Sequence, residues 1–263
     1  MHISEENYDA GRSLNEMLLL RFEPIAVTFI KDESKVPESA IKPRRDMNTP
    51  LALCQGLALT RREKKTLYMD IKDHSCWNPL IGMGHVDCSE GSESFEVAHK
   101  MLGIDDPVLS RRFFAKFPRL PFGEYKGILL APLCFASFVP DVVLIYTNNA
   151  RLRDILLAVK RMTGKLVETQ LDAYDSCVFS LVPTFLSGEY RVTLPDIGEY
   201  ERAMAEEDEI IFSIPGNRMD ELLCGLRAFY ESGRGYAHHH RNMLIDYPRP
   251  EFYTKLLQLW GLD

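Results

Sequence analysis

The spacing of apolar positions predicts short buried strands separated by amphipathic helices. Leucines and a methionine recur at helical spacing over residues 6–21, and F-E-P-I-A-V-T-F-I at 22–30 then predicts a strand. A charged segment with three prolines follows, which is typical of an exposed loop, and a helix is predicted over Leu51–Arg62. Two prolines and an aspartate interrupt the long apolar stretch at 127–146, so it predicts two buried strands rather than a membrane span.

The second half of the chain repeats the pattern of the first half. F-V-P-D-V-V-L-I-Y at 138–146 matches the strand at 22–30, and L-P-D-I-G-E-Y at 194–200 matches L-P-F-G-E-Y at 120–125. Between these segments each copy has a helix and then a Ser-Cys pair. The repeat predicts two strand–helix–strand–strand units related by a pseudo-twofold axis, in an α/β (α+β) fold around mixed sheets.

This internal duplication predicts the domain organisation. We expect one compact domain over residues 1–263, with a first unit at about 10–132 and a second at about 133–220. Residues 221–263 predict a C-terminal helical extension. With 46% hydrophobic residues, the chain can build a sizeable core.

The charge and the N-terminal sequence limit the expected partners and location. The 31 basic and 38 acidic residues give a net charge of -7, which argues against nucleic acid as a partner. The start, M-H-I-S-E-E-N-Y, lacks the features of a signal peptide, so we expect a cytoplasmic protein without a membrane partner. Thiols stay reduced in that compartment, so the six cysteines indicate metal ligation, reactivity or burial rather than disulfides.

Three cysteines are the candidate site residues. Cys76 in H-S-C-W-N-P and Cys177 in Y-D-S-C-V-F occupy matching places, which we expect at strand ends near the pseudo-twofold axis. Cys54 falls in a first helical turn, where the helix N-terminus favours a thiolate. The second unit has Ile155 at the matching place, so packing alone does not require this cysteine. His74 shares a strand face with Cys76 and is a candidate base or ligand.

The remaining cysteines and histidines carry weaker signals. Cys134 and Cys224 lie in apolar sequence, which favours burial, and Cys88 before an acidic helix start is a candidate for exposure. Adjacent residues cannot all face one metal ion, so His238–His240 favours a surface or interface role. The sequence contains no Walker, Rossmann, G-x-S-x-G or H-E-x-x-H motif.

Several of these segments together resemble the domain of unknown function 169 family. They are F-E-P-I-A-V-T-F, Cys54-Gln55 opening a helix, Cys76 after a strand, F-V-P-D-V-V-L-I-Y, Cys177 and D-E-I-I-F-S-I-P. The resemblance covers about residues 10–255 and implies a bacterial or archaeal cytoplasmic protein, frequent in anaerobes, without implying an activity. The family pattern includes cysteines at the positions of Cys54, Cys76 and Cys177, which fits binding of a metal cofactor, whereas Cys88 and Cys224 match nothing in it.

Three functions are compatible with these residues, and they leave open whether the protein is an enzyme. The first is an iron–sulfur protein with a redox or sensing role. Its [4Fe–4S] cluster would be bound by Cys54, Cys76 and Cys177, with a fourth ligand from Cys134, His74 or an exogenous group.

The second is a non-catalytic module that binds a small ligand or tetrapyrrole between the two units, with structural cysteines. The third is a metal-free thiol enzyme with Cys76 as nucleophile and His74 as base. A redox partner or a small-molecule ligand and a homodimer are further expectations.

Overall fold

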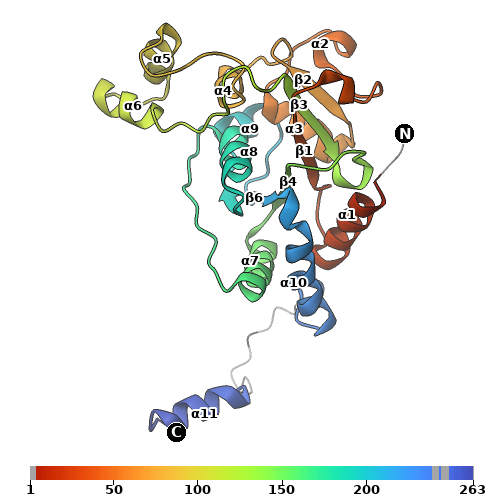
Figure 1. The fold of residues 1–263 in the computed structure, drawn as a ribbon. Coiled ribbons are helices and arrows are strands. Elements are labelled where there is room, and N and C mark those ends of the chain that lie inside the picture. Colours follow the sequence, from red (N-terminus) through yellow and green to blue (C-terminus); the bar gives the residue numbers. More distant parts are fainter. Residues whose placement is uncertain (1–3, 239–242, 244–248, 263) are drawn as a thin grey trace.

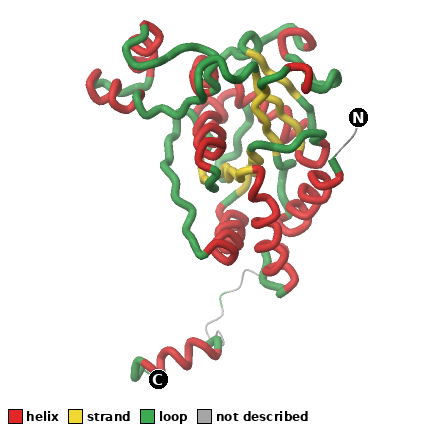
Figure 2. The backbone as a smooth tube through the Cα atoms, in the orientation of Figure 1, coloured by secondary structure: helices red, strands yellow, loops and turns green. Residues whose placement is uncertain are grey.

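A six-stranded antiparallel sheet lies at the centre of the described part of the chain, with the order β2-β3-β1-β4-β6-β5 (Figures 1 and 2). This computed structural model describes residues 4–238, 243 and 249–262. The predicted α+β class is confirmed, and the sheet is antiparallel rather than mixed. The strands are β1 (Ile25–Ile30), β2 (Leu67–Asp70), β3 (Gly127–Pro132), β4 (Val142–Thr147), β5 (Arg191–Thr193) and β6 (Ile210–Pro215).

Helices cover both faces of this sheet. The predicted helices at 6–21 and Leu51–Arg62 are present with small shifts of their ends. The helices are α1 (Glu5–Leu18), α2 (Pro43–Asp46), α3 (Leu53–Glu63), α4 (Trp77–Gly82), α5 (Glu93–Ala98), α6 (Pro107–Phe114), α7 (Asn149–Thr163), α8 (Ser176–Ser187), α9 (Ile197–Arg202), α10 (Met219–Glu231) and α11 (Glu251–Leu259).

Alternate residues of the central strands enter two hydrophobic cores. In β4, Val142, Leu144 and Tyr146 face the first core, whereas Val143 and Ile145 face the second. Side chains of α3, α4 and α8 complete the first core, and side chains of α1, α7 and α10 complete the second. The apolar run in β4 is therefore a strand buried on both faces.

The strand order is symmetric about the central pair of β1 and β4. Outward from this pair, β3 and β2 follow β1, and β6 and β5 follow β4. The backbone N–H of Leu133 donates to the Pro24 carbonyl, and the N–H of Gly216 donates to the Asp141 carbonyl at the corresponding place. The structure thus aligns Pro24 with Asp141, one residue away from the match with Pro140 that the sequence suggests.

The two helices that the sequence equates, α3 and α7, do not share this symmetry. A twofold axis that relates the antiparallel strands β1 and β4 must be perpendicular to the sheet. Rotation about such an axis leaves each helix on its own face of the sheet, so two equivalent helices must cover the same face. However, α3 enters the first core through Leu53 and Leu57, whereas α7 enters the second through Ile155 and Ala158. These two helices are therefore not equivalent, and the predicted match of Cys54 with Ile155 is wrong. A duplication of the strands stays a prediction.

The expected C-terminal extension begins inside the second core. Leu222, Leu223 and Leu226 of α10 are buried there, in contact with α7 and α1. Figure 1 shows α11 apart from the sheet and the other helices. Of the histidine triplet, His238 is exposed, and His239 and His240 lie outside the described residues. None of the helices described here has both the length and the apolar character needed to cross a bilayer.

Substitution of Gly225 tests whether α10 belongs to the core. A Cβ atom at this position would lie 2.7 Å from the Ala158 carbonyl oxygen on α7. We expect Gly225→Ala to lower the free energy of unfolding by about 1–3 kcal/mol, although alanine favours helices by about 1 kcal/mol. Urea denaturation measures this difference, with Cys224→Ala at the exposed neighbouring position as a control that stays within about 0.5 kcal/mol. A stabilised Gly225→Ala variant would contradict close contact between α10 and α7.

Candidate functional site

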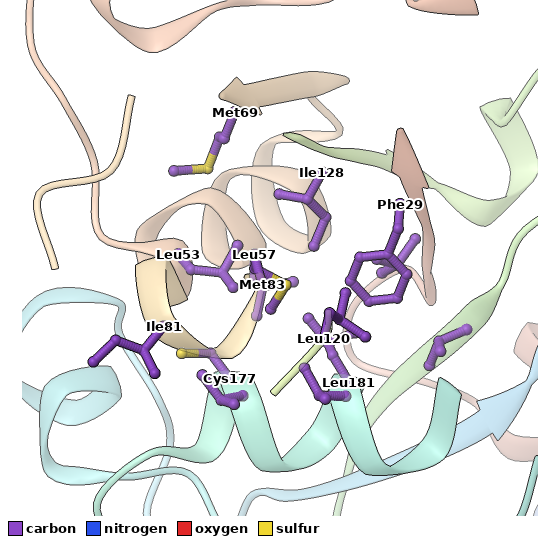
Figure 3. Close-up of a cluster of buried hydrophobic side chains, with 14 of the residues drawn as sticks. Phe29, Leu53, Leu57, Met69, Ile81, Met83, Leu120, Ile128, Cys177 and Leu181 are labelled. Atoms are coloured by element: carbon purple, nitrogen blue, oxygen red, sulfur yellow. The ribbon is translucent and has the colours of Figure 1, made fainter. Parts of the chain in front are cut away.

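Cys54, Cys76 and Cys177 line one cavity on the first-core side of the sheet. The cavity has a volume of about 230 Å³ and lies among the starts of α3, α4, α8 and α9. Cys54 and Cys177 are buried and Cys76 is partly buried. Figure 3 shows Cys177 at the start of α8, among first-core side chains from α3 and α4. The fold therefore brings together the three cysteines that the sequence singles out.

Each of these cysteines lies at a helix start rather than at a strand end. Cys54 and Cys177 are the second residues of α3 and α8, and Cys76 is the N-cap of α4. The backbone N–H groups of a first turn lack partners within the helix and carry partial positive charge. The expected strand-end positions of Cys76 and Cys177 are wrong, whereas the first-turn position of Cys54 is confirmed.

Burial keeps the three thiols protonated while no cation is present. It is the largest cause that raises the pKa of Cys54, to about 12, with further contributions from Glu199 and Asp196. Burial also raises the pKa of Cys76 and, more strongly, that of Cys177. A nucleophilic thiolate needs the opposite shift, so these surroundings do not favour the metal-free thiol enzyme.

A buried polar network lies directly behind the thiols. Glu199 of α9 accepts hydrogen bonds from the Ser176 hydroxyl at 2.6 Å and the Tyr146 hydroxyl at 3.2 Å. The Arg61 guanidinium lies 4.0 Å from the centre of the Tyr146 ring and pairs with Glu209 at 2.6 Å. Burial raises the pKa of Glu199 to about 7. These groups hold α3, α8, α9 and the sheet together beneath the cavity.

Asp175 and Asn78 are site residues that the sequence reasoning missed. Both line the cavity and are buried, and the Asn78 amide donates to Oδ1 of Asp175. Burial, with Asp172 and Asp196, raises the pKa of Asp175 to about 8. Asp175 directly precedes the Ser-Cys pair in D-S-C, where an aspartate normally indicates only a helix cap. Its partner Asn78 is remote in sequence, so the sequence gives no sign of their contact.

His74 and Cys134, the two side chains expected as alternative fourth ligands, do not line the cavity. His74 is buried with its ring centre 5.6 Å from that of His85, and neither of its ring nitrogens has a hydrogen-bond partner among the described residues. Cys134 packs against Gly11 of α1, and its thiol lies 4.0 Å from the Tyr8 carbonyl oxygen. Neither side chain lines the cavity, so His74 is not placed to act as a base there.

The other three cysteines do not line the cavity. Cys134 is buried as expected, whereas Cys88 is buried and Cys224 is exposed, opposite to the expectations for both. All six cysteines are free thiols. Within residues 4–238, 243 and 249–262, no group of three or more His, Cys, Asp or Glu side chains is arranged to hold a metal ion.

Comparisons with known proteins bear on the family. The model of the domain of unknown function 169 family, described as uncharacterised ArCR, matches residues 13–225. An uncharacterised protein of Methanocaldococcus jannaschii is 19% identical over 231 residues, which cover 87% of this chain and 97% of that protein. No solved structure matches the chain. The family resemblance noted from the motifs is confirmed.

The buried His74 predicts a pH-dependent stability. Burial and the neighbouring His85 lower the pKa of His74 to about 3, whereas the unfolded chain has a value of about 6.5. Between these values the unfolded state binds more protons, so the stabilisation is complete above about pH 6.5 and is lost toward pH 3. We expect wild type to lose about 2 kcal/mol more unfolding free energy than His74→Phe between about pH 7 and pH 5.

Urea denaturation of both proteins across this pH range measures the effect. The comparison with His74→Phe removes the contribution of other titrating groups, because these are common to both proteins. If the unfolding free energies of the two proteins changed with pH in parallel, His74 would accept a proton as readily in the folded state as in the unfolded state. This result would contradict a lowered pKa for His74.

Proposed function

Because the chain belongs to the domain of unknown function 169 family, whose description names no activity, we propose a function from the cavity itself. The protein binds an iron–sulfur cluster through Cys54, Cys76 and Cys177, in a redox or sensing role. The observation that carries this proposal is the convergence of three free thiols, from three separate segments, on one cavity.

The helix starts around the cavity suit a negatively charged cluster. The N-termini of α3 and α8, the two longer helices, provide partial positive charge beside Cys54 and Cys177. Binding releases the thiol protons, so the irons overcome the raised pKa values that burial produces. Side chains such as Leu53 and Trp77 line the same cavity and would limit the access of water.

A cluster fits this arrangement better than a single ion. The ligands of a single ion must approach one point, and no such group is found in the described part of the chain. Each thiolate of a cluster binds a different iron, so the sulfur atoms can surround a cavity instead. Thiolate ligands also favour iron–sulfur clusters over hard cations such as magnesium or calcium.

A small organic ligand is the second candidate, because a larger cavity is present elsewhere. It has a volume of about 500 Å³, within the range of small-molecule sites, and no cysteine is among its lining residues in the described chain. Asp141, Phe185 and Thr184 contribute to its wall, and the buried Thr184 hydroxyl has no partner among the described groups. This cavity supports a binding module whose cysteines have a structural role.

Anaerobic purification with iron and acid-labile sulfide analysis tests the first proposal. We expect a coloured wild-type protein, and loss of most of the iron and colour in each of Cys54→Ser, Cys76→Ser and Cys177→Ser, because each variant lacks one ligand. Cys224→Ser on the surface and Cys134→Ser beside α1 are matched controls that should keep the wild-type spectrum.

Two results would contradict the iron–sulfur proposal. One is an iron-free, colourless protein after purification and reconstitution without oxygen. The other is a coloured protein whose spectrum survives all three cysteine substitutions, since the iron would then be bound elsewhere. Either result would favour the second candidate and a structural role for the cysteines.

A further inference from the structure

Asp175 occupies a helix-capping position without capping the helix. It is the N-cap residue of α8, where an aspartate usually accepts a hydrogen bond from the second or third residue of the helix. Its side chain makes no such bond. An N-cap carboxylate that gives up this interaction also gives up helix stability, so its orientation needs another cause.

Asp196, from another segment, binds the first residue of α8. Oδ2 of Asp196 accepts from the backbone N–H of Ser176 at 2.9 Å, while its Oδ1 accepts from the backbone N–H of Glu199 at 2.9 Å. One carboxylate therefore serves the starts of both α8 and α9.

The Asp175 side chain is held at the cavity by Asn78. Oδ1 of Asp175 accepts from the Asn78 amide, and both residues line the cavity with the three cysteines. Oδ2 of Asp175 is buried and has no hydrogen-bond partner among the described residues, and Asp175 as a whole is 1% exposed. A buried oxygen without a partner destabilises the fold, and a ligand in the cavity would offset this cost.

A simple charge pair does not account for this oxygen. Arg202 also lines the cavity, but its side chain is 45% exposed and lies 3.9 Å from a carboxylate oxygen of Glu201. No ion pair between Arg202 and Asp175 is present in the described part of the chain. The unpartnered oxygen therefore points to a group that is bound inside the cavity.

We infer that Oδ2 of Asp175 is the fourth ligand of the cluster held by Cys54, Cys76 and Cys177. This inference rests on the proposed function and assigns the position that His74 and Cys134, which do not line the cavity, leave open. Asn78 acts as a positioning residue, because it fixes Oδ1 and so directs Oδ2. A carboxylate is a harder and weaker ligand for cluster iron than a thiolate, so one iron would exchange its ligand for a small molecule more readily.

Variants of Asp175 test this assignment on anaerobically reconstituted protein. In Asp175→Asn the fourth iron loses its anionic ligand, and we expect loss of one iron per cluster, released as Fe²⁺. After addition of a one-electron oxidant such as ferricyanide, the variant should give the electron paramagnetic resonance signal of an oxidised three-iron cluster. In Asp175→Cys a thiolate takes the place of the carboxylate, so we expect full iron content and a reduced-state signal that differs from that of wild type. Asp105→Asn, at an exposed aspartate outside the cavity lining, is the control and should behave as wild type.

The outcomes separate this inference from the proposed function. An iron-free wild-type protein overturns both. A wild-type cluster whose iron content and signal are unchanged in Asp175→Asn and Asp175→Cys overturns the assignment of Asp175 alone. If Asp175→Asn fails to fold, the altered signal and full iron content of Asp175→Cys still decide the assignment, because that variant keeps an anionic ligand at the same place.

Discussion

Packing of α3 and α8 on the same face of the sheet is the constraint on which the cavity depends. Leu53 and Leu57 of α3 and Leu181 of α8 are buried in the first core, next to strand side chains such as Val142. Both helices therefore start at the same side of the domain, and their second residues face one cavity. Short helices α4 and α9 close it with Cys76 and Asp196, whose carboxylate joins the starts of α8 and α9.

This arrangement concentrates acidic hydrogen-bonding groups where water is scarce. Three thiols and the carboxyl groups of Asp175 and Glu199 share a small buried volume, and burial raises the pKa of each. Without a cation, protonation is the way in which these groups avoid buried negative charge. Bound iron ions would stabilise the deprotonated thiolates and carboxylate, so binding of the cluster would release the protons that these groups hold in its absence. The same features that make Cys76 a poor nucleophile are thus compatible with a ligand for iron.

Some of the fold and the site could be predicted from the sequence. The apolar runs predict the central strands. The matching Ser-Cys pairs, the helix start at Cys54 and the family resemblance single out Cys54, Cys76 and Cys177, whereas wide spacing alone does not separate them from the other three cysteines. Apolar periodicity does not say which face of the sheet a helix covers, so the helices of the two halves were wrongly equated. Asp175 was missed because an aspartate before a helix looks like a cap, and only the contact with Asn78 reveals its other orientation.

We propose that one iron–sulfur cluster occupies the cavity with three sulfur ligands and one oxygen ligand from the protein. The Mössbauer spectrum of protein reconstituted with ⁵⁷Fe without oxygen tests this proposal, because the spectrum reports each iron's valence and ligands. We expect a single cluster in which three irons are alike and one, bound by Asp175, is distinct. A spectrum of isolated high-spin iron, without the features of a cluster, would contradict it.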